Sequence, residues 1–269
     1  MEQPKAGITD KGTGEVLNFS AASTYLKCPK QFEFRYVLGL KIPPKIFMIE
    51  GSAHHKALEK NNLSKKGTGR DLKPSRLVDY FMGDFRGRIK ETGKSLEWEG
   101  EKEDGIFQRA KALLSEYCLR VAPKIKPEAV EEKFQLPVEN GDASFQLNGV
   151  IDLVEKGPVW DYKVTSKAKT DGMVKNSLQL SLYALAAGKS RAGFIQFLKK
   201  ATPEVGMISA VKSKEDKQWA LKVAIDVVKA VKAKVFPRTN PENWWCSEKH
   251  CGYWYLCRGK VTNEKINRR

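Results

Sequence analysis

Residues 149–163 read GVIDLVEKGPVWDYK, and this stretch decides the fold that we expect for the chain. Two apolar segments flank the turn sequence EKGP, which predicts two adjacent β-strands. Asp161 and Lys163 are two residues apart on the second strand, so their side chains project from the same face. Asp152 lies on the neighbouring strand. We therefore expect two carboxylates and one amine to converge at one end of a sheet.

These residue types suit the hydrolysis of a phosphodiester bond. Carboxylate oxygens are the hard ligands that hold Mg²⁺ or Mn²⁺, and such a metal activates water and stabilises developing negative charge. A lysine can orient the attacking water or neutralise charge at phosphorus. The alternative is that Asp152 and Lys163 only pair across a strand edge. The apolar flanks favour catalysis, because charged residues within a buried strand pair are destabilising without a function.

The alternating pattern extends upstream of this stretch. Val130, Phe134, Leu136 and Val138 are apolar residues at alternate positions, with Glu132 as the exception in this series, and Asn140-Gly141 is a strong hairpin signal. We expect an antiparallel meander of three strands, at about 130–138, 144–154 and 159–164. Downstream, the pattern predicts a helix near 175–187, strands near 193–198 and 205–210, and a helix near 214–235.

The region before the meander is predicted to be helical. Ser20 resembles a helix N-cap, Cys28-Pro29 interrupts that helix, and Pro29 suits the first turn of a second helix that runs to about Val37. Residues 1–17 are expected to be a loose lead-in. We expect helices at about 51–61 and 103–120, and exposed helices and loops over 62–102.

Composition limits the partners of the chain. The 269 residues include 48 Lys plus Arg and 32 Asp plus Glu, a net charge of +16 that is spread along the sequence. This favours a polyanionic partner over a basic protein with no specific one. The sequence lacks an apolar run of about 18 residues, and the opening MEQPK lacks a signal peptide's apolar stretch, so we expect an intracellular, cytoplasmic protein without a membrane span.

The stretch around Asp152 resembles the RecB-like nuclease core of the PD-(D/E)XK superfamily. Three further segments resemble that family's motifs in the same order: GSAHHKALE at 51–59, VEEKF at 130–134 and QLSLY at 179–183. The resemblance covers about residues 20–257. It implies an α/β fold with a restriction-endonuclease-like core, in which a central mixed sheet with the antiparallel meander is flanked by helices. A helical N-terminal region and a cysteine-rich C-terminal tail complete this expected fold.

The resemblance implies a role for each matching residue. The metal ligands for Mg²⁺ or Mn²⁺ would be side chains on the helix and the two strands together with one backbone carbonyl, and a lysine would be catalytic. In this sequence, the implied ligands are His55, Asp152, Asp161 and the carbonyl of Tyr162, and the catalytic lysine is Lys163.

Other positions are less sharply defined by the resemblance. Gln179 and Tyr183 are one helical turn apart, and would contact DNA or order the lysine; without the resemblance they would be an ordinary helix face. The motif spacing favours His55 over the adjacent His54, although a lone histidine on a helix is usually structural. The sequence leaves open whether Glu131 or Glu132 contributes to the site.

Five cysteines in a reducing compartment need an explanation other than disulfides. Cys246, Cys251 and Cys257 cluster near the end of the chain, and Cys28 lies more than 200 residues earlier. This arrangement resembles the iron–sulfur subgroup of RecB-like nucleases, and implies that these four thiolates hold a [4Fe–4S] cluster. The four residues between Cys246 and Cys251 depart from that subgroup's usual spacing of two.

Alternatives to the cluster remain open. Zinc is one of them, with His250 as a further ligand, but Cys-x-x-Cys knuckles are absent; free thiols are another. Cys118 is expected to be a buried free cysteine. The aromatic residues near the tail cysteines would shield the cluster from water or stack on bases, and shielding is the preferred interpretation. These residues are Trp244, Trp245, Tyr253, Trp254 and Tyr255.

We expect a single RecB-like nuclease domain over 1–269, with a helical part at 18–125, a core at 126–235 and a tail at 236–269 that packs on the N-terminal helix. The expected activity is that of an exonuclease on single-stranded or frayed DNA, in recombination, repair, phage replication or CRISPR adaptation. The sequence lacks a phosphate-binding helicase motif, so we expect the chain either to act alone or to serve as the nuclease of a helicase, recombination or CRISPR partner protein. The alternative is a non-catalytic DNA-binding module that keeps the fold and cluster.

Overall fold

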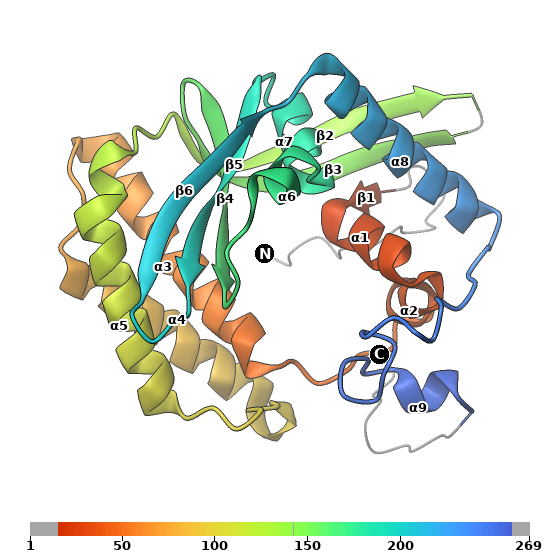
Figure 1. The fold of residues 1–269 in the computed structure, drawn as a ribbon, viewed down its shortest axis with the longest axis horizontal. Helices are drawn as coiled ribbons and strands as arrows, with labels where there is room; N and C mark the ends of the chain where they lie inside the picture. Colours follow the sequence, from red (N-terminus) through yellow and green to blue (C-terminus); the bar gives the residue numbers. More distant parts are fainter. Residues whose placement is uncertain (1–15, 142, 260–269) are drawn as a thin grey trace. The chain divides into compact units, whose positions relative to one another are not determined.

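The computed structural model describes residues 16–141 and 143–259 (Figure 1). Residues 1–15 and the end of the tail after residue 259 lie outside the described residues. The expected loose lead-in over 1–17 is wrong at its end, because Val16 and Leu17 belong to a strand and Leu17 is buried. The chain divides into two compact units. Unit 1 comprises Met1–Pro43, Phe134–Gly149 and Gln218–Arg269, and unit 2 comprises Pro44–Lys133 and Val150–Lys217.

The strands form a mixed sheet, as predicted. β3 pairs with β1 in parallel in unit 1 and with β4 antiparallel in unit 2. β4 and β5 are parallel, β5 and β6 are antiparallel, and β2 pairs with β3. The bounds are β1 Val16–Asn18, β2 Ala129–Asn140, β3 Ala143–Val154, β4 Pro158–Thr165, β5 Arg191–Leu198 and β6 Glu204–Val211.

The central strands confirm the predicted fold class. The three strands β2, β3 and β4 lie where alternation and the Asn140-Gly141 turn place them, and Gly141 has a φ of 54° that suits glycine. At Gly149, in the segment that precedes Asp152, close packing explains why the residue is glycine. A Cβ atom at this position would lie 2.5 Å from the ring of Phe134, so only glycine leaves room for that ring.

Helices of unit 2 bury one face of its strands. Helices α3, α4 and α5 pack on one another and against β4 and β6 (Figure 1). Their apolar side chains and those of Trp160 and Tyr162 form one core. Because side chains alternate along β4, Asp161 and Lys163 face the opposite way, toward α7. The bounds are α3 Ile46–Thr68, α4 Pro74–Thr92, α5 Glu103–Arg120, α6 Asp171–Lys175 and α7 Leu178–Ala186, with short 3-10 turns at Gly93–Ser95 and Ala122–Lys124.

Several expectations about the helices are wrong. The helix expected near 175–187 is two helices, α6 and α7. Residues 62–102 are not merely exposed: α4 buries Leu77, Phe81 and Phe85, which are spaced four apart and so line one helix face. The first helix, α1 (Phe19–Lys27), is capped by Asn18, whose side chain accepts from the backbone of Ala21, and not by Ser20. None of the helices in residues 16–141 and 143–259 is long and apolar enough to cross a membrane.

Unit 1 joins the two ends of the chain. The Tyr25 hydroxyl donates to the carbonyl of Val235 (2.7 Å), and the Tyr253 hydroxyl donates to the carbonyl of Leu40 (2.7 Å). The backbone of Lys30 donates to Pro237 (3.2 Å). These contacts hold the C-terminal segment against the N-terminal helices. The remaining helices are α2 Pro29–Phe32, which continues as a π-helix over Glu33–Val37, α8 Lys214–Lys232 and α9 Trp254–Cys257.

Candidate active site and cysteine pocket

Asp152 lies at the centre of the candidate active site in unit 2. Its side chain is buried near the end of β3 and accepts a hydrogen bond at Oδ2 from the backbone N–H of Tyr162 (2.7 Å). Its Oδ1 lies 3.3 Å from Nδ1 of His55. The first contact fixes the carboxylate against β4, and the second joins it to helix α3.

His55 contacts two oxygen atoms at once. Its Nδ1 faces the Asp152 carboxylate, and its Nε2 lies 3.1 Å from the carbonyl oxygen of Tyr162. Because both partners are acceptors, the ring satisfies them best as an imidazolium with two N–H donors. Burial alone would lower the pKa of His55, but the charge of Asp152 and its hydrogen bond raise that pKa to about 9.

The adjacent His54 faces the core instead. It is fully buried, its Nδ1 contacts the carbonyl of Glu50 (2.9 Å), and its ring packs edge-on against Phe81. Burial lowers its pKa to about 4, so the ring is neutral at physiological pH. The geometry therefore favours His55 over His54 as the residue that serves the site.

Glu131 joins His55 and Asp152. Each of these three residues offers one ligand atom, and the three atoms lie within 4.8 Å of one another. Glu131 has a φ of 52°, a left-handed conformation that is unfavourable for a non-glycine residue and that interrupts the regular alternation of β2. Burial, and then the charge of Asp152, raise the pKa of Glu131 to about 7. Glu132 is exposed, so the geometry favours Glu131 where the sequence left both possible.

Asp161 is buried and held by two partners. Its Oδ1 accepts from the side-chain amide of Gln179 (2.6 Å), and its Oδ2 lies 2.6 Å from the ammonium of Lys163. Oδ2 is buried, and its ion pair with Lys163 leaves a second lone pair for another ligand. Burial raises the pKa of Asp161 above its ordinary value, and Lys163 opposes that rise.

Helix α7 brings Gln179 to this carboxylate. The side chain of Ser177 caps the helix by accepting from the backbone of Leu180 (3.3 Å), so Gln179 lies in the first turn. Tyr183, one turn later, accepts from the Gln179 amide (3.0 Å). The two residues therefore form a chain that ends on Asp161, as their spacing predicts.

The donor set fits a divalent cation. Carboxylates, a carbonyl and one imidazole are ligands that Mg²⁺ and Mn²⁺ accept in proteins. Burial raises the pKa of both Glu131 and Asp161, and the negative charge of Asp152 raises both further. A bound cation would offset the repulsion among these carboxylates. The buried Oδ2 of Asp161 is ion-paired with Lys163 and keeps a second lone pair that a cation can take.

The structure brings together most of the residues that the sequence singled out for this site. His55, Asp152 and the carbonyl of Tyr162 are in direct contact, while Asp161 lies outside the group of three that converge most closely. Asp161 instead pairs with Lys163. The sequence could not resolve Glu131, because the backbone conformation that turns it inward is not visible in an alternating pattern.

Four cysteines line one pocket in unit 1. Cys28, Cys246, Cys251 and Cys257 border a cavity of about 280 Å³. Burial raises the pKa of Cys251, the backbone of Tyr253 opposes this, and the other three thiols raise it further because they lie close by. Among the described residues, no three of these thiols bring their sulfur atoms within 4.8 Å of one another. Cys118 is separate, in unit 2, where burial raises its pKa to about 11.

Aromatic residues around the pocket have different surroundings. Tyr253 and Trp254 line it, and Tyr253 is buried. Trp244 is 68% exposed, so it does not shield the pocket. His250, the expected zinc ligand, is not among the lining residues and packs edge-on against Trp244.

Solved structures resemble this chain only distantly. The protein SSO0001 is 15% identical, with a TM-score of 0.39, over 76% of this chain and 96% of that one. A candidate exonuclease from Eubacterium rectale is 13% identical, with a TM-score of 0.44, over 82% and 89%. Rai1 from Scheffersomyces stipitis is 11% identical, with a TM-score of 0.28, over 84% and 70%. These likenesses are too weak to carry an argument.

A search among curated proteins gives no match. The sequence model of the PD-(D/E)XK nuclease superfamily matches residues 16–258, which is nearly the whole described chain. This match agrees with the mixed α/β fold and with the acidic site on its central strands. The chain belongs to the PD-(D/E)XK nuclease superfamily.

Proposed function

We propose that this chain is a Mg²⁺- or Mn²⁺-dependent deoxyribonuclease, and that it acts as an exonuclease on single-stranded or frayed DNA ends. The observation that carries the proposal is the convergence of His55, Glu131 and Asp152 within 4.8 Å, beside the pair of Asp161 and Lys163. The net charge of +16 supports a polyanionic substrate.

The proposed ligands are side chains of four elements and one backbone carbonyl. A bound metal supplies Lewis-acid stabilisation and lowers the pKa of a water molecule. The buried backbone of β4 fixes the carbonyl, and the N–H of Tyr162 orients Asp152. In this proposal the ligands are His55, Glu131, Asp152, Asp161 and the carbonyl of Tyr162.

Lys163 is the proposed catalytic lysine. Its ammonium lies 2.6 Å from Asp161, and one third of its side chain is exposed, so it can also reach a bound phosphate or water. There it donates a hydrogen bond to the attacking water or to a phosphate oxygen on which charge develops. Gln179 keeps the other oxygen of Asp161 occupied and so holds the carboxylate in one orientation.

The test compares end-labelled linear DNA with covalently closed circular DNA, each with Mg²⁺ or Mn²⁺. We expect shortening of linear DNA from its ends and no cutting of circles. Lys163→Met should abolish shortening, and Lys222→Met, an exposed lysine on α8, is the matched control. Equal cutting of circles would contradict the exonuclease proposal. DNA binding without any cleavage would favour the alternative of a non-catalytic module.

We also propose that Cys28, Cys246, Cys251 and Cys257 hold a [4Fe–4S] cluster with a structural role. Four thiols that border one cavity support a centre with several metal atoms. A single zinc ion would draw its thiolates to about 4 Å from one another, given Zn–S bonds of about 2.3 Å. Among the described residues, no three of these sulfur atoms lie within 4.8 Å of one another, which supports the cluster over a zinc ion held by these thiolates.

Anaerobic purification tests the cluster. We expect brown protein with about four iron atoms per chain and broad absorbance near roughly 400 nm. A colourless protein with one zinc ion, or a stable protein with no metal, would overturn the cluster while leaving the nuclease proposal intact.

A cytoplasmic role in recombination, repair, phage replication or CRISPR adaptation, with a helicase as partner, is part of the proposal. Its test is faster degradation of duplex ends when a helicase unwinds them.

A further inference from the structure

Helix α3 contacts Tyr162 at both ends of that residue. Near the backbone, Nε2 of His55 lies 3.1 Å from the Tyr162 carbonyl, and the two rings meet edge to face at 5.5 Å. At the far end, the Asn62 side-chain amide donates to the Tyr162 hydroxyl (2.6 Å). His55 and Asn62 are seven residues, or about two turns, apart, so they lie on the same face of α3. The helix thus holds Tyr162 by its carbonyl and by its phenol.

Asn62 is an unusual residue for its position. It is fully buried within a helix, where asparagine is less favourable than an apolar residue and where an unpaired amide is destabilising. Its two polar atoms are both used, because the Tyr117 hydroxyl donates to its Oδ1 (3.4 Å). Burial raises the pKa of Tyr117, which keeps this hydroxyl protonated. Asn62 therefore links α5 to β4 through hydrogen bonds inside the core.

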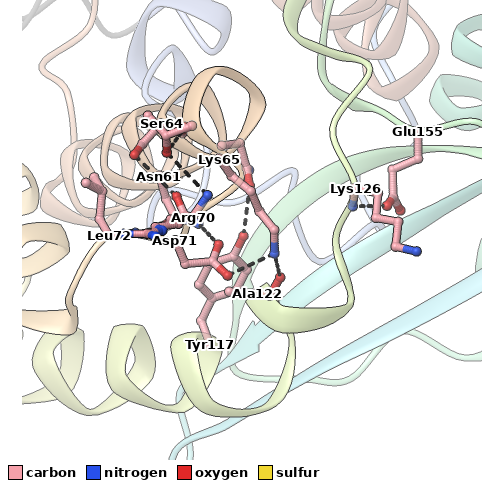
Figure 2. Close-up of polar contacts among 12 residues, drawn as sticks. Asn61, Ser64, Lys65, Arg70, Asp71, Leu72, Tyr117, Ala122, Lys126 and Glu155 are labelled. Carbon is pink, nitrogen blue, oxygen red and sulfur yellow. Dashed lines mark hydrogen bonds and ion pairs between the residues drawn. The ribbon is translucent and has the colours of Figure 1, made fainter.

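The neighbouring turn of α3 is held in place independently. Asn61 donates to Asp71 (2.9 Å) and accepts from the backbone of Leu72 (2.9 Å), and the Lys65 ammonium joins Asp71 to the carbonyl of Ala122 (Figure 2). Asn61 is fully buried. These contacts restrict the helix at the point from which the Asn62 side chain projects.

We propose that Asn62 is a positioning residue for the active site, which acts by holding the phenol of Tyr162. The inference rests on the proposed metal-dependent function. Tyr162 supplies the N–H that orients Asp152 and the carbonyl that contacts His55, so a shift of this residue moves both groups. Asn62 touches neither of them itself. Its hydrogen bond sets how α3 and β4 face each other where the proposed ligands meet.

The test measures Mn²⁺ affinity without DNA, by calorimetry, together with the thermal midpoint. Asn62→Leu and Tyr162→Phe should each weaken Mn²⁺ binding about tenfold, which is typical when a group that orients a metal ligand is lost. Both should also lower the midpoint, because Tyr162→Phe removes the partner of the Asn62 amide, and Asn62→Leu removes the partner of the Tyr162 and Tyr117 hydroxyls. The double variant removes both ends of the Asn62–Tyr162 bond, so its midpoint should rise above that of Asn62→Leu, while its Mn²⁺ affinity should stay about tenfold weaker.

A purely structural role predicts a different result. Mn²⁺ affinity would then be unchanged in the single variants, or would recover together with the thermal midpoint in the double variant, and either outcome overturns the proposal. Tyr117→Phe, which removes only the distant hydroxyl, should leave Mn²⁺ affinity within about twofold.

Asp152→Asn separates this inference from the function on which it rests. If Asp152→Asn leaves Mn²⁺ binding unchanged, the proposed metal site itself is wrong. If Asp152→Asn abolishes binding while Asn62→Leu has no effect, only the positioning role is wrong. The expected result is loss of binding in Asp152→Asn and weakened binding in Asn62→Leu.

Discussion

The acidic site takes its residues from adjoining elements of unit 2, whereas the cysteine pocket takes its residues from the two ends of the chain in unit 1. Asp152 and Asp161 lie on neighbouring strands with a short turn between them, while Cys28 and Cys251 are more than 200 residues apart. The acidic site also holds like charges close together, which opposes folding, and the pocket gathers neutral or metal-bound thiols. We therefore expect changes in the first site to separate activity from stability, and changes in the second to couple them.

The largest expected effect comes from Asp161→Asn. Loss of a proposed metal ligand should lower the cleavage rate by about 10³-fold, or roughly 4 kcal/mol in the barrier. The raised pKa of Asp161 means that its ionised form destabilises the folded state at neutral pH, so the thermal midpoint should stay the same or rise. Asp226→Asn, an exposed change on α8, is the control for both measurements. A large fall in the midpoint would break the contrast between the two sites.

Cys251→Ser should act in the opposite way. A centre that joins Cys28 to the tail closes a loop of more than 200 residues, and its loss should destabilise the fold by a few kcal/mol. Activity should fall only in proportion to the unfolded fraction, as followed by circular dichroism and cleavage on the same sample. Cys118→Ser, outside the pocket, should change stability by no more than about 1 kcal/mol. Equal effects of the two serine variants would contradict a structural centre.

The matched variants Glu131→Gln and Glu132→Gln test which of these two glutamates belongs to the acidic site. We expect Glu131→Gln to lower the cleavage rate about 100-fold, because it removes a charge from the group of converging ligands. Glu132 is exposed, so Glu132→Gln should stay within about twofold of wild type. A larger effect of Glu132→Gln would reverse the assignment between these neighbours.

The last expected effect is on the pH dependence of metal affinity. Glu131, with a pKa of about 7, and His55, with a pKa of about 9, hold protons near neutral pH that a cation must displace. Mn²⁺ affinity should therefore rise from pH 6 to pH 8, by about tenfold per pH unit for each proton released. The measurement is Mn²⁺ titration in buffers of constant ionic strength. Affinity that is flat over this interval would show that these protons are absent.

The sequence predicts the strands well because their physical cause is local. Alternation and the Asn140-Gly141 turn place β2 and β3, and the segment that ends at Lys163 places β4. The start of α3 is missed, since the helix begins at Ile46 and not near Gly51. Buried polar residues such as Glu50 and Asn62 disturb the apolar stripe by which such a helix is recognised. The apolar residues of α4 have a helical spacing, but the many charged residues around them favour the prediction of an exposed segment.

The sequence does not predict those residues of the candidate site whose roles depend on tertiary contacts. The spacing of Asp152, Asp161 and Lys163 indicates their common location, because a strand has a fixed period. The choice between Glu131 and Glu132 depends on one left-handed residue, and the importance of Asn62 depends on a tyrosine 100 residues away. Neither contact leaves a periodic signal in the sequence. The roles of these residues remain predictions for the variants above to test.

The left-handed conformation of Glu131 implies a trade-off between stability and activity. A non-glycine residue in this region is destabilised by about 1–2 kcal/mol, which glycine would relieve. Selection for heat resistance alone would therefore favour Glu131→Gly and discard a proposed ligand. Any engineering of this chain for robustness would have to select for catalysis at the same time, since this gain in stability lies at a residue whose loss is expected to lower the cleavage rate.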